Sequence, residues 1–269
     1  CLQLLLEAGA DKDRPSDDGS TPLHLAAAPM YHEGDAGRAG RTGERVSANH
    51  RCLQLLLEAG ANIDKADQWG STPLHLAAEL GHKRCLQLLL EAGASIEEVD
   101  GDGCTPLHLA AVRGSHRCLQ LLLEAGANIE GVDGNGRTPL HVAAERDQKR
   151  CLELLLEAGA KEDKVDDNGS TPLHLAARCC NPSSLQLLLE VGADKDKTDG
   201  EGNAPVHLAF SDPWMIRTFA ERAVECLRLL LDAGVDKDKA ACDGRTPIHL
   251  AASLRAGECL GLLLEAGAD

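Results

Sequence analysis

Histidine is the residue of this sequence best suited to acid–base chemistry, and most of its histidines share one setting. Seven of the eleven stand fourth in a Thr-Pro-Leu-His tetrapeptide or a close variant of it: His24, His75, His108, His141, His174, His207 and His249. A general base must lie within hydrogen-bond reach of the group it deprotonates, and no nucleophile accompanies the tetrapeptide. We therefore expect structural histidines and no catalytic residue.

Cysteine is equally abundant and equally regular. Seven of the eleven cysteines stand at one position, directly before a leucine-rich run: Cys1, Cys52, Cys85, Cys118, Cys151, Cys226 and Cys259. In stacked repeats equivalent residues lie about 8–10 Å apart, whereas a disulfide needs Cα atoms within about 7 Å. We expect free, half-buried thiols in a reducing compartment, without disulfides. The vicinal pair Cys179–Cys180 has no Cys or His pair with ligand spacing nearby, so we expect no metal site.

Two acidic, glycine-rich stretches resemble cation-binding loops. They are "DGDG" at 100–103 and "DGNG" at 133–136. With Asp100 and Asp102 at the third and fifth loop positions of an EF-hand, Leu109 falls where the bidentate glutamate belongs. No phosphate-binding GxxxxGK[ST] stretch is present. The sequence therefore predicts no cofactor and no small-molecule substrate.

The elements that carry these residues recur along the chain. The tetrapeptides begin at residues 21, 72, 105, 138, 171, 204 and 246, and the steps between them are 51, 33, 33, 33, 33 and 42 residues. The decapeptide "CLQLLLEAGA" occurs at 1–10, 52–61, 85–94 and 118–127. The sequence is thus a set of 33-residue repeats, and two of them carry insertions of 18 and 9 residues.

Each repeat contains signals for two short helices. Thr72 is a good N-cap, and Pro73 suits the first helical position, where no backbone donor is missed. In the second segment Leu86, Leu89 and Leu90 keep helical spacing, and a glycine that favours a left-handed cap follows. A single helix pair cannot cover its own leucine face, so stacked repeats must bury it.

These features resemble the ankyrin-repeat family, and the resemblance covers the chain from end to end. It implies an all-α solenoid of stacked helix–turn–helix units joined by short β-hairpin-like fingers. It also implies that each motif histidine hydrogen-bonds within and between repeats. The motif residues are Thr72, Pro73, His75, Thr105, Pro106, His108, Thr138, Pro139, His141, Thr171, Pro172 and His174.

The repeat boundaries follow from the period. We expect one ankyrin-repeat domain over 1–269, and its first residues belong to the middle of a repeat, which predicts a slice of a longer array. The predicted parts are a partial repeat at 1–15, repeats at 16–66 (18-residue insertion), 67–99, 100–132, 133–165, 166–198 and 199–240 (9-residue insertion), and a truncated repeat at 241–269.

Composition narrows the class of partner. Aromatic residues make up only 2% of a chain that is 43% hydrophobic, which implies a core of leucine and small residues. No apolar run approaches the roughly 18 residues that span a bilayer, so we expect no membrane insertion. The net charge of −16 argues against nucleic acid, whose phosphates require clustered Lys and Arg.

Most of that charge lies in the fingers. The seven eight-residue fingers hold 23 acidic and 9 basic residues, and they are 11–18, 62–69, 95–102, 128–135, 161–168, 194–201 and 236–243. The fingers 95–102 and 128–135 contain no Lys or Arg, and Trp69 ends the finger before them. One interpretation is a solvated, solubilising edge. The other is an acidic edge that binds a basic segment of a partner protein, through Trp69, Glu97, Glu98, Asp100, Asp102, Glu130 and Asp133.

The two insertions differ in kind. The one within 28–51 is rich in Gly, Ala and Arg and lacks apolar periodicity, which predicts a mobile loop. The other predicts one nearly continuous helix over 213–232, about two turns longer than its counterparts. That helix would carry a secondary candidate surface, formed by Trp214, Ile216 and Phe219.

Two classes of function remain open, with a third beside them. The first is a non-catalytic, monomeric protein-binding module, a scaffold or adaptor in the cytoplasm or nucleus, that uses the finger edge and the concave inner-helix face the resemblance implies. The second is the recognition arm of a larger enzyme or channel. The third is a spacer array with little specificity, although the sequence differences among fingers argue modestly against it.

Overall fold

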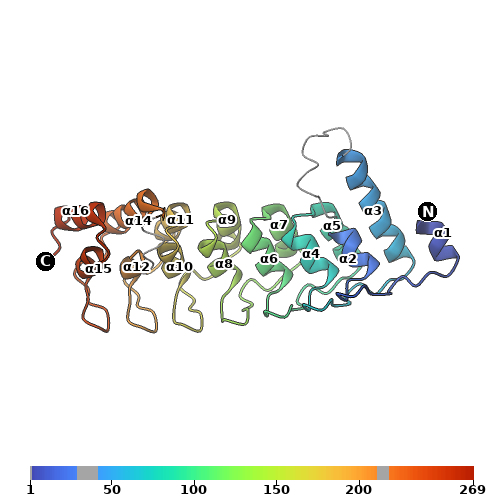
Figure 1. Ribbon diagram of the computed structural model, residues 1–269, viewed down its shortest axis with the longest axis horizontal. Helices are drawn as coiled ribbons and strands as arrows, with labels where there is room; N and C mark the ends of the chain where they lie inside the picture. The colour runs from blue at the N-terminus through green and yellow to red at the C-terminus, as the bar shows by residue number, and fades with distance from the viewer. Residues whose placement is uncertain (1, 29–41, 211–217) are drawn as a thin grey trace. The chain divides into compact units, whose positions relative to one another are not determined.

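The computed structural model describes residues 2–28, 42–210 and 218–269, and in these ranges the regular secondary structure is helical, without strands. The chain divides into two compact units, Cys1–Gly134 and Asn135–Asp269. Figure 1 shows that in each unit the fingers are loops that project to one side of the helices. The all-α solenoid architecture is therefore confirmed, with hairpin-like fingers that lack regular strands.

Helix α4 (Pro73–Glu79) shows why each inner helix begins where it does. Thr72 has extended backbone angles (φ −92°, ψ 166°), and Pro73 follows it as the first helical residue. The amide N–H of Thr72 donates to Nδ1 of His75 at 3.1 Å, and Thr72 Oγ1 lies 2.9 Å from the same nitrogen. The helix ends at Glu79, and Gly81 follows its C-cap Leu80 with a φ of 72°, in the left-handed region.

The outer helices follow the leucine pattern. In α5 (Lys83–Glu91), Cys85, Leu86 and Leu89 are buried, whereas Lys83 and Arg84 are exposed. Gly93 ends the helix with a φ of 88°, and the Ala94 amide donates to Leu89 O at 3.0 Å. A fully buried leucine stabilises the fold by about 1.5–3 kcal/mol relative to an exposed one, so these runs contribute strongly to the core, together with the buried leucines and alanines of the inner helices.

In the first unit, inner and outer helices alternate along the chain. The inner helices are α2 (Pro22–Ala27), α4 and α6 (Pro106–Arg113). The outer helices are α1 (Leu2–Glu7), α3 (Thr42–Glu58), α5 and α7 (His116–Glu124). Successive inner helices pack on each other, as do successive outer helices, so each repeat buries the apolar face of its neighbour.

The second unit repeats this plan. Its inner helices are α8 (Pro139–Glu145), α10 (Pro172–Arg178), α12 (Pro205–Leu208) and α15 (Pro247–Ser253). Its outer helices are α9 (Lys149–Glu157), α11 (Pro182–Glu190), α14 (Ala220–Asp232) and α16 (Gly257–Glu265). In neither unit does a described helix combine the length and apolar character needed to cross a bilayer.

The two insertions compare differently with their predictions in the parts that the structure describes. Helix α3 begins at Thr42, so the second half of the stretch predicted as a loop is helical. Once a helix exists, each added residue gains a backbone hydrogen bond without a new nucleation cost, and apolar periodicity is not required. Helix α14 begins at Ala220, and Phe219 before it has non-helical angles (φ −125°, ψ 43°). In the described part of the nearly continuous helix predicted over 213–232, Thr218 and residues 220–232 are helical and Phe219 interrupts them, while 211–217 lie outside the described residues.

The motif histidines link repeats, as the resemblance implied. Because Nδ1 of His75 accepts from Thr72, its proton lies on Nε2, which donates to the carbonyl of Cys104 in the next repeat at 3.0 Å. His24 reaches Ser71 O at 2.9 Å in the same way. In the second unit His141, His174 and His207 reach Ser170 O, Asn203 O and Lys239 O. Burial lowers the pKa of His75 and of His174, which favours these neutral rings.

The repeated cysteines lie in the helix–helix contacts. Cys85, Cys118 and Cys151 are buried, deeper than the half-burial expected from the sequence. The Cys85 thiol donates to Ala26 O at 3.8 Å, and the Cys118 thiol donates to Ala77 O at the same distance. Burial raises the pKa of both thiols to about 11. These cysteines therefore serve as small apolar packing residues.

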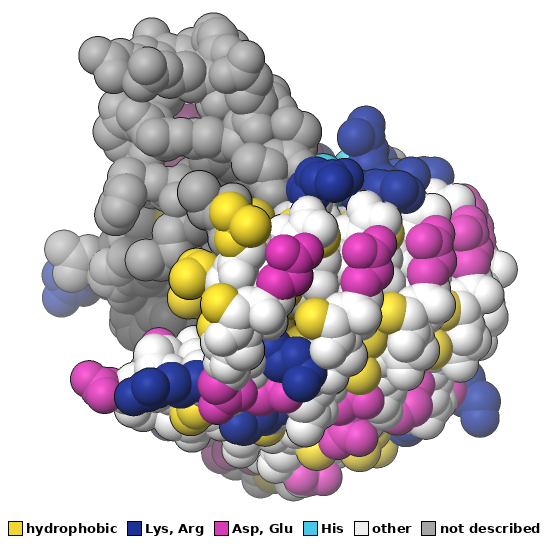
Figure 2. Space-filling model, turned by 90° about the vertical axis from the view of Figure 1, so that its right-hand side faces the viewer, with side chains coloured by type: hydrophobic (Ala, Val, Ile, Leu, Met, Phe, Trp, Pro, Cys, Tyr) yellow, Lys and Arg dark blue, Asp and Glu magenta, His cyan; other side chains and the backbone are white. Residues whose placement is uncertain are grey.

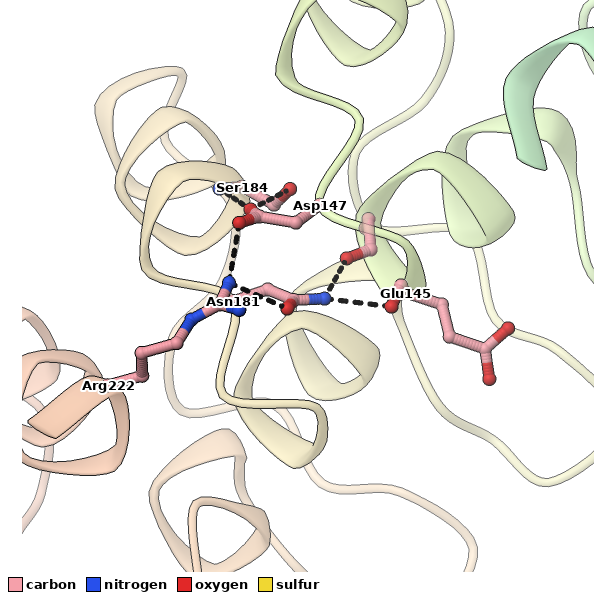
Figure 3. A network of polar contacts seen from close by, with 6 residues as sticks. Glu145, Asp147, Asn181, Ser184 and Arg222 are labelled. Atoms are coloured by element: carbon pink, nitrogen blue, oxygen red, sulfur yellow. Dashed lines mark hydrogen bonds and ion pairs between the residues drawn. The ribbon is translucent and has the colours of Figure 1, made fainter. Parts of the chain in front are cut away.

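A polar network joins three repeats of the second unit (Figure 3). Asn181 Nδ2 donates to Ala144 O at 2.9 Å and to Glu145 O at 2.8 Å. Asp147 Oδ1 accepts from both the amide and the hydroxyl of Ser184 at 3.0 Å. Arg222 Nη2 donates to Asp147 Oδ2 at 2.7 Å. The network fixes the start of α11 and of α14 against the loop after α8.

Candidate functional site

Three consecutive fingers, 62–69, 95–102 and 128–135, have an aspartate at their sixth position. In the finger 95–102, Asp100 Oδ1 accepts from the Asp102 amide at 3.0 Å and from the Cys104 amide at 2.8 Å. Asp67 makes the same pair of bonds to Trp69 and Ser71, each at 2.9 Å. Asp133, at the equivalent position, is only 5% exposed. These carboxylates therefore shape the finger tips.

A second set of carboxylates, at the third finger position, joins each finger to the next. Glu97 Oε1 accepts from the Asn128 amide at 2.8 Å, and Asp64 Oδ1 accepts from the Ser95 amide at 2.9 Å. One finger earlier, Asp13 Oδ1 accepts from the Asn62 amide at 2.7 Å. We call these bonds the finger ladder. Sequence reasoning missed it, although an acidic residue at the third position of all seven fingers was the available signal.

Backbone hydrogen bonds fix the tips themselves. The Gly101 amide donates to Trp69 O at 2.7 Å, and the Gly134 amide donates to Asp102 O at 2.9 Å. A Cβ at Gly101 would lie only 2.9 Å from Trp69 O, so the close approach of these two tips requires glycine. The Trp69 backbone is thus held on both sides, while 59% of the residue remains exposed.

The finger 95–102 differs from its neighbours at the fourth position. Lys65 Nζ, at that position in the preceding finger, donates to Asp13 O at 3.1 Å. Glu98 replaces this lysine in the finger 95–102, and Gly131 replaces it in the next. The carboxylates of Glu98 and Asp102 are exposed and make no hydrogen bond or ion pair with another described residue. Figure 2 shows Lys and Arg side chains among the acidic ones on the lower part of this face, where the fingers lie.

The structure therefore sorts the predicted site residues. Trp69, Glu98 and Asp102 are exposed on adjacent fingers and available to a partner, and we call them the tip cluster. Glu97 is exposed but engaged in the finger ladder, and Glu130 is half-buried with its amide donating to Asn128 Oδ1 at 3.1 Å. Asp100 accepts the amides of its turn, and Asp133 is buried at the equivalent position.

The secondary candidate surface is only partly described. Phe219 is half-buried before α14, and the Arg222 guanidinium carbon lies 6.0 Å from its ring centroid. Trp214 and Ile216 lie outside the described residues. In the described ranges, no group of three or more His, Cys, Asp or Glu side chains is arranged to hold a metal ion.

Comparison with protein families matches this geometry. A family model described as ankyrin repeats (3 copies) matches residues 45–133, 130–199 and 198–269, and a single ankyrin-repeat model matches residues 18–68. The chain therefore belongs to the ankyrin-repeat family, whose members are generally protein–protein interaction modules.

Individual relatives share parts of the chain or its fold. Ankyrin repeat and SOCS box protein 16 from Homo sapiens is 35% identical over 82 residues, which are 30% of this chain and 14% of that protein. The match thus spans about a seventh of that relative's length. The crystal structure of the human ASB11 ankyrin repeat domain superposes with a TM-score of 0.73 at 27% identity, covering 93% of this chain and 99% of that one. The ankyrin repeat domain of Bcl-3, a member of the IkappaB protein family, gives a TM-score of 0.67 at 31% identity, covering 91% and 100%.

Proposed function

We propose that the chain is a non-catalytic protein-binding module, a scaffold or adaptor, whose finger edge from Trp69 through Asp133 binds a basic segment of another protein. One observation carries the proposal: Glu98 and Asp102 are exposed and unpaired on a finger without a cation, beside the exposed Trp69. In this proposal the tip cluster contacts the partner. Glu97 and Glu130 add negative charge, and Asp100 and Asp133 hold the tips in place.

The two kinds of contact would contribute differently. Exposed ion pairs contribute about 0.2–1 kcal/mol each and weaken with salt. They therefore act mainly on the association rate. A tryptophan that becomes desolvated in an interface can contribute about 2 kcal/mol or more. Trp69 would accordingly set the dissociation rate.

The inner-helix face is a second part of the proposed surface. Leu25 on α2 is 58% exposed, and Leu76 and Leu109 at the equivalent positions are half-buried. These leucines offer an apolar area to the same partner. The Phe219 region remains a separate, secondary candidate.

Two other functions fit the same fold. An array of this kind can serve as the recognition arm of a larger enzyme or channel, and it can serve as a spacer. Exposed, unpaired acids on the finger 95–102, which carries no cation, favour specific binding over the spacer. We also propose a monomer that acts in the cytoplasm or nucleus, in keeping with the ten free thiols of the described residues.

The test is a pull-down from a cytosolic extract at low and moderate salt, followed by kinetic measurements on the captured partner. The variant E98Q/D102N should slow association and flatten its salt dependence, while Trp69→Ala should speed dissociation. The control variant E91Q/E124Q removes the same number of charges from α5 and α7 and should bind as the parent chain does. If E98Q/D102N and the parent recover the same proteins in equal amounts, the acidic edge is only a solubilising face.

A further inference from the structure

The tips of the first three fingers form a regular series in the first unit. Asp18, Trp69 and Asp102 each occupy the eighth position of consecutive fingers. The Gln68 amide donates to Asp18 O at 3.0 Å, and the Gly101 amide donates to Trp69 O at 2.7 Å. The inner helices behind these fingers, α2, α4 and α6, pack in succession. Since packed helices lie about 8–10 Å apart, the three side chains are spaced by about that distance.

The two outer members of this series are anionic. Asp102 is exposed, with no hydrogen-bond or ion-pair partner for its carboxylate among the described residues. Asp18 is half-buried, its Oδ1 accepts from Ser16 Oγ and from the Ser20 amide, and the Ser20 side chain is a further hydrogen-bond partner of the carboxylate. The hydrogen bond from Ser16 lowers the pKa of Asp18, so this carboxylate stays ionised at neutral pH. The series is thus acid, aromatic, acid.

The spacing selects among the conformations that a bound segment can have. In a β-strand, side chains on one face recur about every 6.7 Å, which does not match one finger. In a polyproline II helix they recur every three residues at about 3.1 Å per residue, or about 9.3 Å. In an α-helix, residues three or four apart share a face at about 4.5–6 Å along the axis, and the next recurrence, after seven residues, lies at about 10.5 Å. The polyproline II period is the one that falls within the finger spacing.

The exposed surface between the finger tips at Trp69 and Asp102 also favours a bound chain that is narrow. Gly101 lies between them, and no side chain can be added there because its Cβ would meet Trp69 O. This exposed surface is therefore bare backbone, on which a chain without internal hydrogen bonds can lie directly. Aromatic surfaces are also common docking sites for proline in this conformation.

We infer that the finger tips bind a basic, proline-containing segment in the polyproline II conformation, with a proline over Trp69 and a Lys or Arg three residues away on each side, facing Asp18 and Asp102. This inference rests on the proposed function and narrows it to a partner with a defined spacing.

Peptides with varied spacing test this inference by fluorescence anisotropy at low salt. The first, fluorescein-labelled RPPPPPR, has arginines six residues apart around a central proline. Two others, RPPPPR and RPPPPPPR, change that distance by one residue, and RRPPPPP keeps the composition. An alanine-based helical peptide with arginines seven residues on either side of a central leucine tests the α-helical alternative.

The in-register peptide should bind about two- to five-fold more tightly than either shifted peptide, since each shift weakens one exposed ion pair. The variants D18N and D102N should each remove that preference, and Trp69→Ala should weaken binding of all proline peptides. The control E91Q should change nothing.

Equal binding of all the arginine peptides, still dependent on Glu98 and Asp102, would overturn the spacing inference and leave the proposed function standing. Tighter binding of the helical peptide would also overturn it. If no basic peptide binds, or if binding ignores Glu98, Asp102 and Trp69, both the inference and the proposed finger-edge site fail.

Discussion

Arg222 donates a hydrogen bond to Asp147 at 2.7 Å, although 75 residues separate them in the sequence. Asp147 has a φ of 55°, in the left-handed region, where the first unit places Gly81 and Gly114. A non-glycine residue in this conformation costs about 1–2 kcal/mol. The hydrogen bonds from Arg222 and Ser184 to its carboxylate offset that cost. They stabilise at Asp147 a backbone conformation that the first unit reaches with glycine.

The loss of stability on replacing Asp147 should therefore depend on which residue replaces it. We expect Asp147→Ala to lower the free energy of unfolding by about 1–3 kcal/mol, since it loses the polar network and keeps the strained backbone. Asp147→Gly should cost less, because glycine relieves the strain. Urea unfolding followed by circular dichroism measures both. Equal losses for the two variants would show that the left-handed backbone carries no cost.

The buried histidines make stability fall in mild acid. Burial lowers the pKa of His75 below the ordinary 6.5, against the opposing effects of the Cys104 carbonyl, Asp100 and Glu98. Burial likewise lowers the pKa of His174, against Asn203 O, Asp199 and Asp166. Below about pH 6.5 the unfolded chain therefore binds more protons than the folded one. Stability present above that pH is lost as the pH decreases, by at most about 1.4 kcal/mol per pH unit for each histidine.

Unfolding midpoints in urea at pH 7.5, 6.5 and 5.5 measure this dependence. His75→Gln should make the decline shallower, whereas His116→Gln, an exposed control on α7, should leave its slope unchanged. A midpoint independent of pH over this range contradicts the prediction.

Thiol reactivity should separate the cysteines by burial. Cys242 is exposed, whereas burial raises the pKa of Cys85 and Cys118 to about 11. Since the thiolate is the reactive form, Cys242 should react with a disulfide reagent long before these two. Labelling followed by peptide mass spectrometry gives the order. After unfolding without reductant the count should reach all eleven cysteines, and nine or fewer would indicate a disulfide.

The finger ladder predicts opposite behaviour for two adjacent glutamates. Glu97→Ala should lower the free energy of unfolding by about 1–3 kcal/mol, because the Asn128 amide loses a charged acceptor. Glu98→Ala should change it by less than about 0.5 kcal/mol, the usual range for a surface substitution. Chemical unfolding of both variants makes the comparison. If Glu98→Ala proves the more destabilising, the assignment of structural and available carboxylates is reversed.

Local signals were enough to predict the helices. Thr72 and Pro73 mark a helix start, and Gly93 marks an end, because capping and left-handed backbone depend on residues close in sequence. The insertion within 28–51 was mispredicted because helix α3 extends through residues without apolar periodicity, and the interruption at Phe219 was not foreseen because the start of α14 is tied to Asp147 in a distant repeat. Local sequence carries neither fact.

The sequence identified the residues of the candidate site but not the role that each one has. Trp69, Glu98 and Asp102 were all singled out, yet Asp100 has the same charge and a different task. Whether a carboxylate accepts backbone amides depends on the path of the turn and on the finger beside it. Those distances exist only after the repeats have stacked.

The direction of the finger ladder determines what happens when a whole repeat is deleted from the gene. Each finger offers a carboxylate to the finger after it and an amide to the finger before it. Residues 52–61, 85–94 and 118–127 are identical, so recombination between them would remove whole 33-residue segments. Recombination between 52–61 and 85–94 would remove residues 62–94 and join Ala61 to Ser95, and Asp13 would then face the Ser95 amide as it now faces that of Asn62. The shortened array would have one finger fewer, each remaining finger would keep its hydrogen bond to the next, and Trp69 would be lost. The proposed aromatic anchor can thus be deleted in one genetic event that leaves the stacking of the repeats unchanged.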